Sequence, residues 1–248
     1  MEIQVKEFIL SLADNSMILG QRLGEWCGHG PVLEQDIALT NIALDLIGEA
    51  RNYYHYLAET EGKQEDDYPM LRDVRAFRNV LLVEQPNGHW GDTIVRQCMF
   101  DCYHYHFLKG LTTSSDSRLS AIAKKSLKEA TYHLTFSSEW IIRLGDGSQE
   151  SNLKIQKSVE DLMPYFEEMF MPASFEIYCL EHKICPDLNS IKKEANFKFM
   201  EIIHEATLKI PTSFFSKSGG KTGLHSEHLG YILAELQYLQ RSYPGAIW

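Results

Sequence analysis

Three polar residues stand out because each lies inside a long helical stretch: Glu49, Asp101 and His133. Carboxylates and imidazoles inside helices are the donors that hold a pair of irons in helical bundles. Such a site takes one carboxylate from each of two helices and a Glu-x-x-His pair from each of two others, since residues three apart share a helical face. The positions of the three residues fall close to this plan.

The ligand set that this plan requires is incomplete. Asn52 replaces the histidine expected three residues after Glu49, and Ala130 replaces the glutamate expected three residues before His133. The central position of the first helix is occupied by Met17. An amide binds iron poorly, a thioether is too soft, and a methyl group cannot bind it at all.

We therefore expect no metal ligand, catalytic residue or cofactor-binding residue in this chain. Using Glu129 in place of Ala130 does not restore the site, because its side chain is rotated by about 100° from the required direction. Without a metal, buried acids must be paired or neutralised, and Glu49 is expected to face Asp101. The vestigial di-iron-like positions are Met17, Glu49, Asn52, Asp101, Ala130 and His133.

Two further motifs offer weaker evidence of chemistry. His225 and His228 lie where the last expected helix begins, and capping or hydrogen bonding is favoured there over a shared metal. Residues 218–223 (SGGKTG) are rich in glycine but lack the spacing of a phosphate-binding loop and follow no strand. Lys217 and Lys221 in this loop are candidates to meet a partner carboxylate or a cofactor phosphate.

The elements that must position these residues are helices. Apolar residues recur at helical spacing nearly throughout, so we predict one all-α domain over residues 1–248. Asp116 or a nearby serine is expected to cap the helix that Gly145 ends. Four long helices are expected over residues 5–23, 34–61, 92–109 and 119–144, with shorter ones over 72–83, 153–171, 190–208 and 224–243.

Composition limits the classes of function. The 248 residues are 44% hydrophobic and 23% charged, as in globular proteins, and the net charge of -10 disfavours binding to nucleic acid or anionic lipid. Five cysteines without a CxxC pair indicate reduced thiols in a cytoplasmic protein. We expect neither a signal peptide nor a membrane span, because the first residues lack a basic region and no apolar run is long enough.

Several blocks of the sequence resemble a single family. They are residues 19–29 (LGQRLGEWCGH), 44–52 (LDLIGEARN), 82–88 (LVEQPNG), 128–134 (KEATYHL), 219–230 (GGKTGLHSEHLG), 237–241 (QYLQR) and the final Trp248. Together they resemble the non-catalytic C subunits of bacterial phenylacetyl-CoA epoxidase. The similarity runs from about residue 8 to the C-terminus and is weakest over residues 150–205.

The resemblance implies a ferritin-like bundle and a structural, non-catalytic subunit of the multicomponent monooxygenase of aerobic phenylacetate degradation. That complex epoxidises the aromatic ring of phenylacetyl-CoA with O₂ and NADPH. In the family, the di-iron centre belongs to a homologous catalytic A subunit, and a B subunit and a flavin/iron–sulfur reductase complete the complex. The resemblance implies no cofactor in this chain.

Two other functions remain open at this point. A self-sufficient di-iron oxygenase with atypical ligands would contain stoichiometric iron, and a helical module that binds an acyl-CoA would bind it as an isolated chain. A permanent partner surface, by contrast, is expected to bury about 2,000 Å² or more and to be apolar at its centre. Its candidates, unless accessory helices cover them, are Tyr53, Tyr54, Tyr56, Tyr103, His104, Tyr105 and Phe107.

Overall fold

The computed structural model describes residues 1–246, and Trp248 of the C-terminal block lies outside the described residues. These residues form helices, turns and loops without a strand, which confirms the all-α prediction. None of the described helices is both long enough and apolar enough to cross a membrane. The chain divides into two compact units, and the expectation of a single domain stays a prediction.

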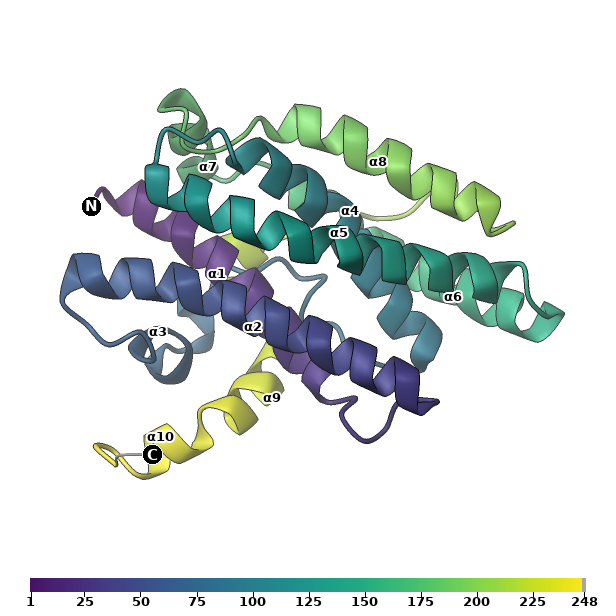
Figure 1. The fold of residues 1–248 in the computed structure, drawn as a ribbon, viewed down its shortest axis with the longest axis horizontal. Coiled ribbons are helices and arrows are strands. Elements are labelled where there is room, and N and C mark those ends of the chain that lie inside the picture. Colours follow the sequence, from purple (N-terminus) through teal and green to yellow (C-terminus); the bar gives the residue numbers. More distant parts are fainter. Residues whose placement is uncertain (247–248) are drawn as a thin grey trace. The chain divides into compact units, whose positions relative to one another are not determined.

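The first unit comprises Met1–Gln85, Ala173–Tyr178 and Gly219–Trp248. Its two long helices, α1 and α2, lie side by side and run in opposite directions (Figure 1). The C-terminal helix α9 packs on α1, and α10 packs on α3. The elements are α1 (Ile3–Gly24), α2 (Leu33–Glu61), α3 (Asp67–Leu71), η1 (Val74–Ala76), η3 (Gly220–Thr222), α9 (Glu227–Leu236) and α10 (Tyr238–Ser242).

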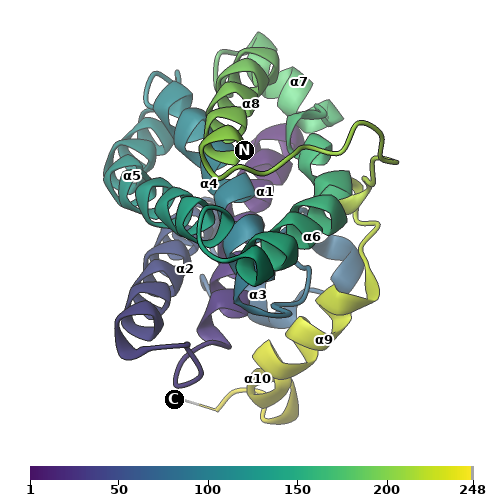
Figure 2. The same ribbon diagram turned by 90° about the vertical axis from the view of Figure 1, so that its right-hand side faces the viewer.

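The second unit comprises Pro86–Pro172 and Cys179–Ser218. Its helix α4 is central, because α5, α6 and α8 all pack against it (Figure 2). The elements are α4 (Trp90–Leu111), α5 (Ser117–Gly145), α6 (Gln149–Phe166), η2 (Glu167–Phe170) and α8 (Leu188–Glu205). Helix α7 (Ser174–Glu181) contributes its first residues to the first unit and its last residues to the second.

Helix ends follow local capping chemistry. The carboxylate of Asp116 accepts hydrogen bonds from the backbone N–H groups of Arg118 (2.9 Å) and Leu119 (3.0 Å), as expected for the cap of α5. Helix α2 ends at Gly62, whose φ of 67° lies in the left-handed region that glycine adopts without strain. The four long helices begin and end within about two residues of the predicted bounds.

The prediction of a helix over residues 72–83 is wrong. Only the short η1 forms there, because side chains of α1 take up backbone donors that a helix would use. The N–H of Arg78 donates to Asp14 (2.8 Å), and the N–H of Val80 donates to the side-chain oxygen of Asn15 (2.8 Å). The last predicted helix is also divided, into α9 and α10, and α7 was not predicted.

Candidate functional site

Asp101 lies in the middle of α4 and is 1% exposed. Its two carboxylate oxygens accept hydrogen bonds from neighbouring side chains. The amide of Gln97, one turn earlier on α4, donates to Oδ1 at 2.7 Å, and the hydroxyl of Ser137 on α5 donates to Oδ2 at 2.7 Å. The carboxylate is thus buried and provided with donors from within its own unit.

Burial raises the pKa of Asp101 to about 6, well above the usual range of an aspartate. The positive charge of His133, the hydrogen bond from Ser137, the charge of His104 and the hydrogen bond from Gln97 all act in the opposite direction. Desolvation outweighs these favourable contacts, so the ionised form of Asp101 is costly to keep in the fold.

The remaining two predicted positions of this unit lie on α5. Ala130 is 2% exposed and His133 is 2% exposed, and their spacing of three places them on the same face of the helix. His133 acts electrostatically on Asp101, which places an imidazole beside the carboxylate. Ala130 brings only a methyl group to the same face, so this helix supplies one donor where a metal site of this plan needs two.

The other three positions belong to the first unit. Met17 on α1 is 6% exposed, and its sulfur lies 3.9 Å from the amide nitrogen of Gln21. Glu49 on α2 is 5% exposed, and the hydroxyl of Ser16 donates to its Oε1 at 3.4 Å. Asn52 is half-buried one turn further along α2. The expected approach of Glu49 to Asp101 stays a prediction.

The donor chemistry of these six positions does not fit a pair of irons. A thioether, an amide and a methyl group stand where three hard or borderline donors are required, so the charge of two irons would be poorly balanced. Among residues 1–246, no group of three His, Cys, Asp or Glu side chains within either unit is arranged to hold a metal ion. The prediction that this chain binds no metal and no cofactor still awaits a direct measurement.

A buried carboxylate that the sequence analysis passed over is Asp14 of α1. It is 0% exposed and accepts hydrogen bonds from the hydroxyl of Tyr54 (2.7 Å), the backbone of Arg78 and the guanidinium of Arg72. Burial and the nearby Asp14 charge raise the pKa of Tyr54 well above its usual range, so this phenol stays protonated. The signal in the sequence was an acid on the apolar face of α1. Asp14 holds together three segments of the first unit through these hydrogen bonds.

His225 is committed to a second buried cluster, around Glu84. Its Nδ1 lies 3.1 Å from a carboxylate oxygen of Glu84, and its Nε2 lies 3.1 Å from the carbonyl oxygen of Phe77. The backbone N–H of Ser226 donates to the other oxygen of Glu84 at 2.7 Å. The structural role favoured for His225 is confirmed, and its ring is not available for a metal shared with His228.

The two lysines of the glycine-rich loop also have partners within the chain. Lys221 is 6% exposed and donates to both carboxylate oxygens of Glu176, at 2.9 and 3.0 Å. Gly220 makes this possible, because a Cβ there would lie 2.1 Å from the carbonyl oxygen of Asn79. Lys217 donates to the hydroxyl of Tyr165 at 2.9 Å. Lys221 is therefore a structural cation, and its predicted contact with a cofactor phosphate or a partner carboxylate is wrong.

Most of the aromatic residues predicted for a partner surface are buried. Tyr56 and Tyr105 are half-buried, and the remaining predicted side chains are at most 5% exposed. The expectation that the aromatic side chains form a partner surface is therefore wrong for five of the seven candidates. The five buried residues are Tyr53, Tyr54, Tyr103, His104 and Phe107.

Long helices without a strand among residues 1–246 define an all-α protein of the ferritin-like helical class. The chain belongs to the phenylacetic acid catabolic protein family, which it matches over residues 2–248. A relative from Escherichia coli (strain K12), the C subunit of 1,2-phenylacetyl-CoA epoxidase, is 46% identical over 246 residues, which cover 99% of this chain and 99% of that protein. The resemblance drawn from the sequence blocks is confirmed.

Proposed function

We propose that this chain is the structural, non-catalytic subunit of a multicomponent phenylacetyl-CoA monooxygenase that acts in aerobic phenylacetate degradation. In this proposal it binds and stabilises a homologous catalytic A subunit, which holds the di-iron centre, and works with a B subunit and a reductase. The complex is cytoplasmic and hetero-oligomeric, and it epoxidises the aromatic ring with O₂ and NADPH.

One observation carries the proposal: the chain is 46% identical, end to end, to an epoxidase subunit, yet three of its six ligand-like positions cannot hold iron. Met17, Asn52 and Ala130 remove half of the donors, and Gln97 and Ser137 donate to Asp101, one of the two carboxylates that remain. A bundle that keeps the fold of a catalytic family without its metal chemistry contributes to the enzyme through association.

The test is to express this chain and its catalytic homologue from the same organism separately and together. We expect a stable complex by light scattering, iron only in the catalytic chain by elemental analysis, and epoxidation with the reductase and B subunit present. A catalytic chain that is stable and fully active without this chain would contradict the proposal. About two irons per chain in the separately purified protein would instead support a self-sufficient oxygenase.

A further inference from the structure

A pocket of about 390 Å³ opens on the second unit, where α4, α5 and α8 pack on one another (Figure 2). Its volume falls in the range of about 300–1,000 Å³ that is typical of small-molecule sites. Tyr105 and His106 line it from α4, Lys198 lines it from α8, and α5 supplies the remaining wall. All of these residues belong to the second unit, so one unit provides the whole pocket.

The inner wall that α5 supplies offers no hydrogen-bond donor to a ligand. Leu134 is buried there, and the three hydroxyl groups beside it donate to backbone carbonyl oxygens of α5 itself. Thr131 does so at 2.7 Å, Thr135 at 2.9 Å and Ser138 at 2.5 Å. Because these protons are already used within the helix, a molecule that enters the pocket meets mainly carbon on this side.

The residues from α4 and α8, by contrast, bring polar groups that the fold does not use. Neither the hydroxyl of Tyr105 nor the ring of His106 hydrogen-bonds to another described residue, although the two rings contact each other with centroids 5.0 Å apart. The ammonium of Lys198 lies 3.6 Å from Glu201, which is too far for a direct hydrogen bond. A few convergent polar groups beside an apolar wall are typical of a small-molecule site.

The charges around the pocket favour a ligand with a single negative charge. Burial lowers the pKa of His106 despite the nearby charge of Glu194, so the ring is neutral at pH 7. Among the described residues that line the pocket, Lys198 alone is positively charged at that pH. The acid of the lining, Glu139, is 59% exposed and pairs with Arg143 at 3.5 Å. One lysine matches a carboxylate, whereas a phosphate dianion would keep an unmatched charge close to these acids.

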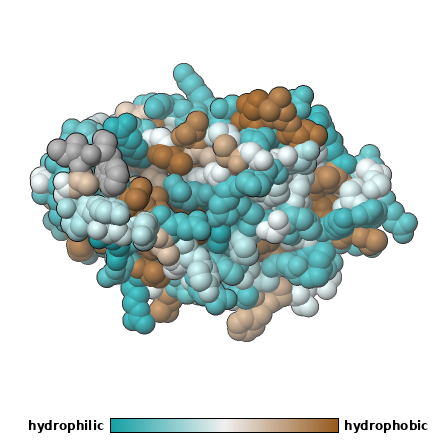
Figure 3. All heavy atoms as spheres, turned by 90° about the horizontal axis from the view of Figure 1, so that it is seen from below, coloured by the Kyte–Doolittle hydropathy of each residue, from teal (hydrophilic) through white to brown (hydrophobic). Residues whose placement is uncertain are grey.

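We propose that this pocket binds a small organic carboxylate, with its charged group at Lys198, Tyr105 and His106 and an aryl or alkyl body against α5. Apolar surface alone would not identify such a site, because Figure 3 shows several hydrophobic patches among hydrophilic residues on the face that it presents. The distinguishing feature is the combination of one cation, two uncommitted hydrogen-bonding groups and an apolar wall. The assignment goes beyond the proposed function and does not depend on it.

The first experiment measures binding to the purified full chain. The probes are 4-fluorophenylacetate and octanoate, and 4-fluorophenylacetamide is an uncharged control of nearly the same shape. We expect titration followed by ¹⁹F NMR to show saturable binding of 4-fluorophenylacetate and its displacement by octanoate. The amide should bind about tenfold more weakly or not at all, because it has no charge for the ammonium to recognise.

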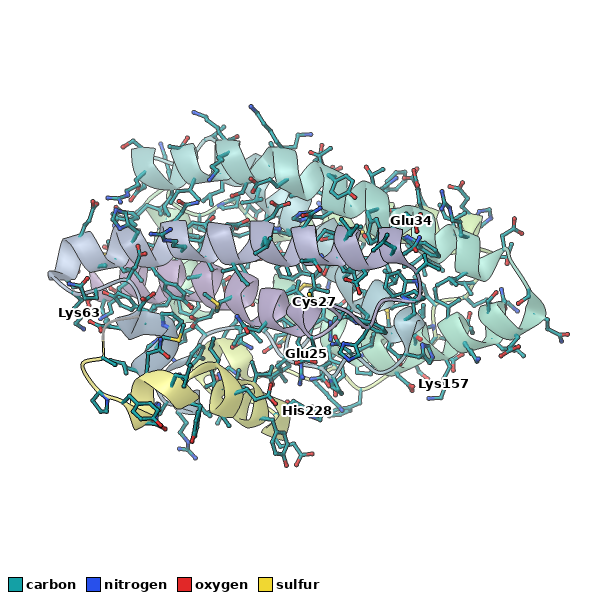
Figure 4. The ribbon with its side chains drawn as sticks, turned by 60° about the horizontal axis from the view of Figure 1, so that its bottom comes forward. Glu25, Cys27, Glu34, Lys63, Lys157 and His228 are labelled. Carbon is teal, nitrogen blue, oxygen red and sulfur yellow. The ribbon has the colours of Figure 1, made fainter. Side chains whose placement is uncertain are left out.

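The second experiment locates the bound carboxylate by substitution. Lys198→Met should weaken binding of 4-fluorophenylacetate about tenfold, and Lys198→Arg should retain it, because only methionine removes the charge. Thr135→Trp should abolish binding by filling the pocket, and it is compatible with folding because Thr135 is exposed. Lys157→Met is the matched control, since Lys157, labelled in Figure 4, lies on α6 of the same unit and is 66% exposed. Circular dichroism and thermal unfolding verify that each variant is folded.

Three results would overturn the assignment. Wild-type protein that binds neither carboxylate has no such site. Equal binding by wild type and by folded Lys198→Met or Thr135→Trp would place the bound carboxylate elsewhere on the chain. Equal binding of the amide and the acid would show that the pocket recognises no charge. The proposed function is tested separately, by association with the catalytic subunit, so the two can fail independently.

Discussion

Asp101 illustrates how a buried carboxylate is accommodated by protein contacts. Gln97 and Ser137 donate to its two oxygens, yet burial still dominates and raises its pKa to about 6. Hydrogen bonds to a carboxylate favour the ionised form, so a raised value means that the loss of water costs more than these bonds return. Stability and pH are therefore linked at this residue.

The linkage predicts an unusual effect of Asp101→Asn. The pKa of Asp101 in the folded state, about 6, exceeds its value in the unfolded state. Ionisation of Asp101 therefore costs the folded protein no stability at low pH, and this cost grows as pH rises from about 4 to about 6. The variant removes that cost, since its amide can still accept from Gln97 and can donate to Ser137. We expect it to be more stable at pH 7 by about 1–3 kcal/mol, measured by urea unfolding across this range.

Asp187→Asn is the control with the opposite sign. Asp187 is half-buried at the cap of α8, and hydrogen bonds from Ser190 hold its pKa below the usual range. Its contribution is present at neutral pH and is lost as pH falls through the lowered folded value. The difference in unfolding free energy between wild type and Asp101→Asn should therefore change with pH. A difference that stays constant from pH 4 to pH 7 would show that Asp101 is not buried as described.

The degraded ligand set predicts that a metal site can be rebuilt. Met17→Glu, Asn52→His and Ala130→Glu together should create affinity for Fe(II) or Co(II), because they supply the three donors that the two-iron plan lacks in this sequence. Each substitution alone should not, since a partial set leaves charge unbalanced. Cobalt absorption in the visible range is the measurement, and a folded triple variant without it would disprove the placement of these positions.

At the scale of elements, the features that could be predicted from the sequence are those that depend on neighbouring residues along the chain, namely the helices and their ends. Helical periodicity located the four long helices, and the cap at Asp116 and the break at Gly145 were visible in the residue types. The candidate positions followed from the same periodicity, and Gln97, one turn from Asp101, was within reach of that reasoning. Ser137 was not, because its contact with Asp101 joins two helices and leaves no local pattern.

The non-helical segment after Arg72 has the same explanation. The N–H groups of Arg78 and Val80 donate to Asp14 and Asn15, which lie more than sixty residues away, so local propensity does not decide the structure there. The buried tyrosines were misjudged for a related reason. Their exposure depends on which helices cover them, and periodicity alone does not say which face receives a neighbour.

The cluster at Glu84 predicts an asymmetric pair of substitutions. His225→Ala leaves a fully buried carboxylate without its ring partner and should cost about 3–5 kcal/mol of unfolding free energy. Glu84→Gln should cost much less, since the glutamine can accept from the N–H of Ser226 and can still hydrogen-bond to Nδ1 of His225. Denaturant unfolding of the two single variants and the double variant measures the coupling, and equal losses would contradict this pairing.

At the scale of the molecule, this chain keeps the helices of a family of enzymes while its buried polar residues serve the fold. Asp14, Glu84 and Glu176 are all buried acids, and each is matched by a cation or by several hydrogen-bond donors. The contacts that hold the first unit together thus balance the charges of these three acids.

This arrangement predicts that chemistry in the complex is insensitive to the remaining acids. Glu49→Gln/Asp101→Asn should leave kcat for epoxidation within about twofold of wild type in the reconstituted complex, because neither carboxylate takes part in the reaction. Steady-state kinetics with reductase and B subunit, together with light scattering to show that the complex is intact, provide the test. A loss of a hundredfold or more in an intact complex would place catalysis in this chain.

The distance along the chain between Glu84 and His225 sets an order of events during synthesis. The two residues are 141 positions apart, and ribosomes add about 5–20 residues per second. Glu84 is therefore made roughly 7–30 s before the imidazole that it needs, and Glu176 likewise precedes Lys221. Until residues 219–226 emerge, the nascent chain holds two acids without these partners, so the N-terminal helices cannot complete their unit early. A premature stop codon before residue 219 would leave both acids unmatched.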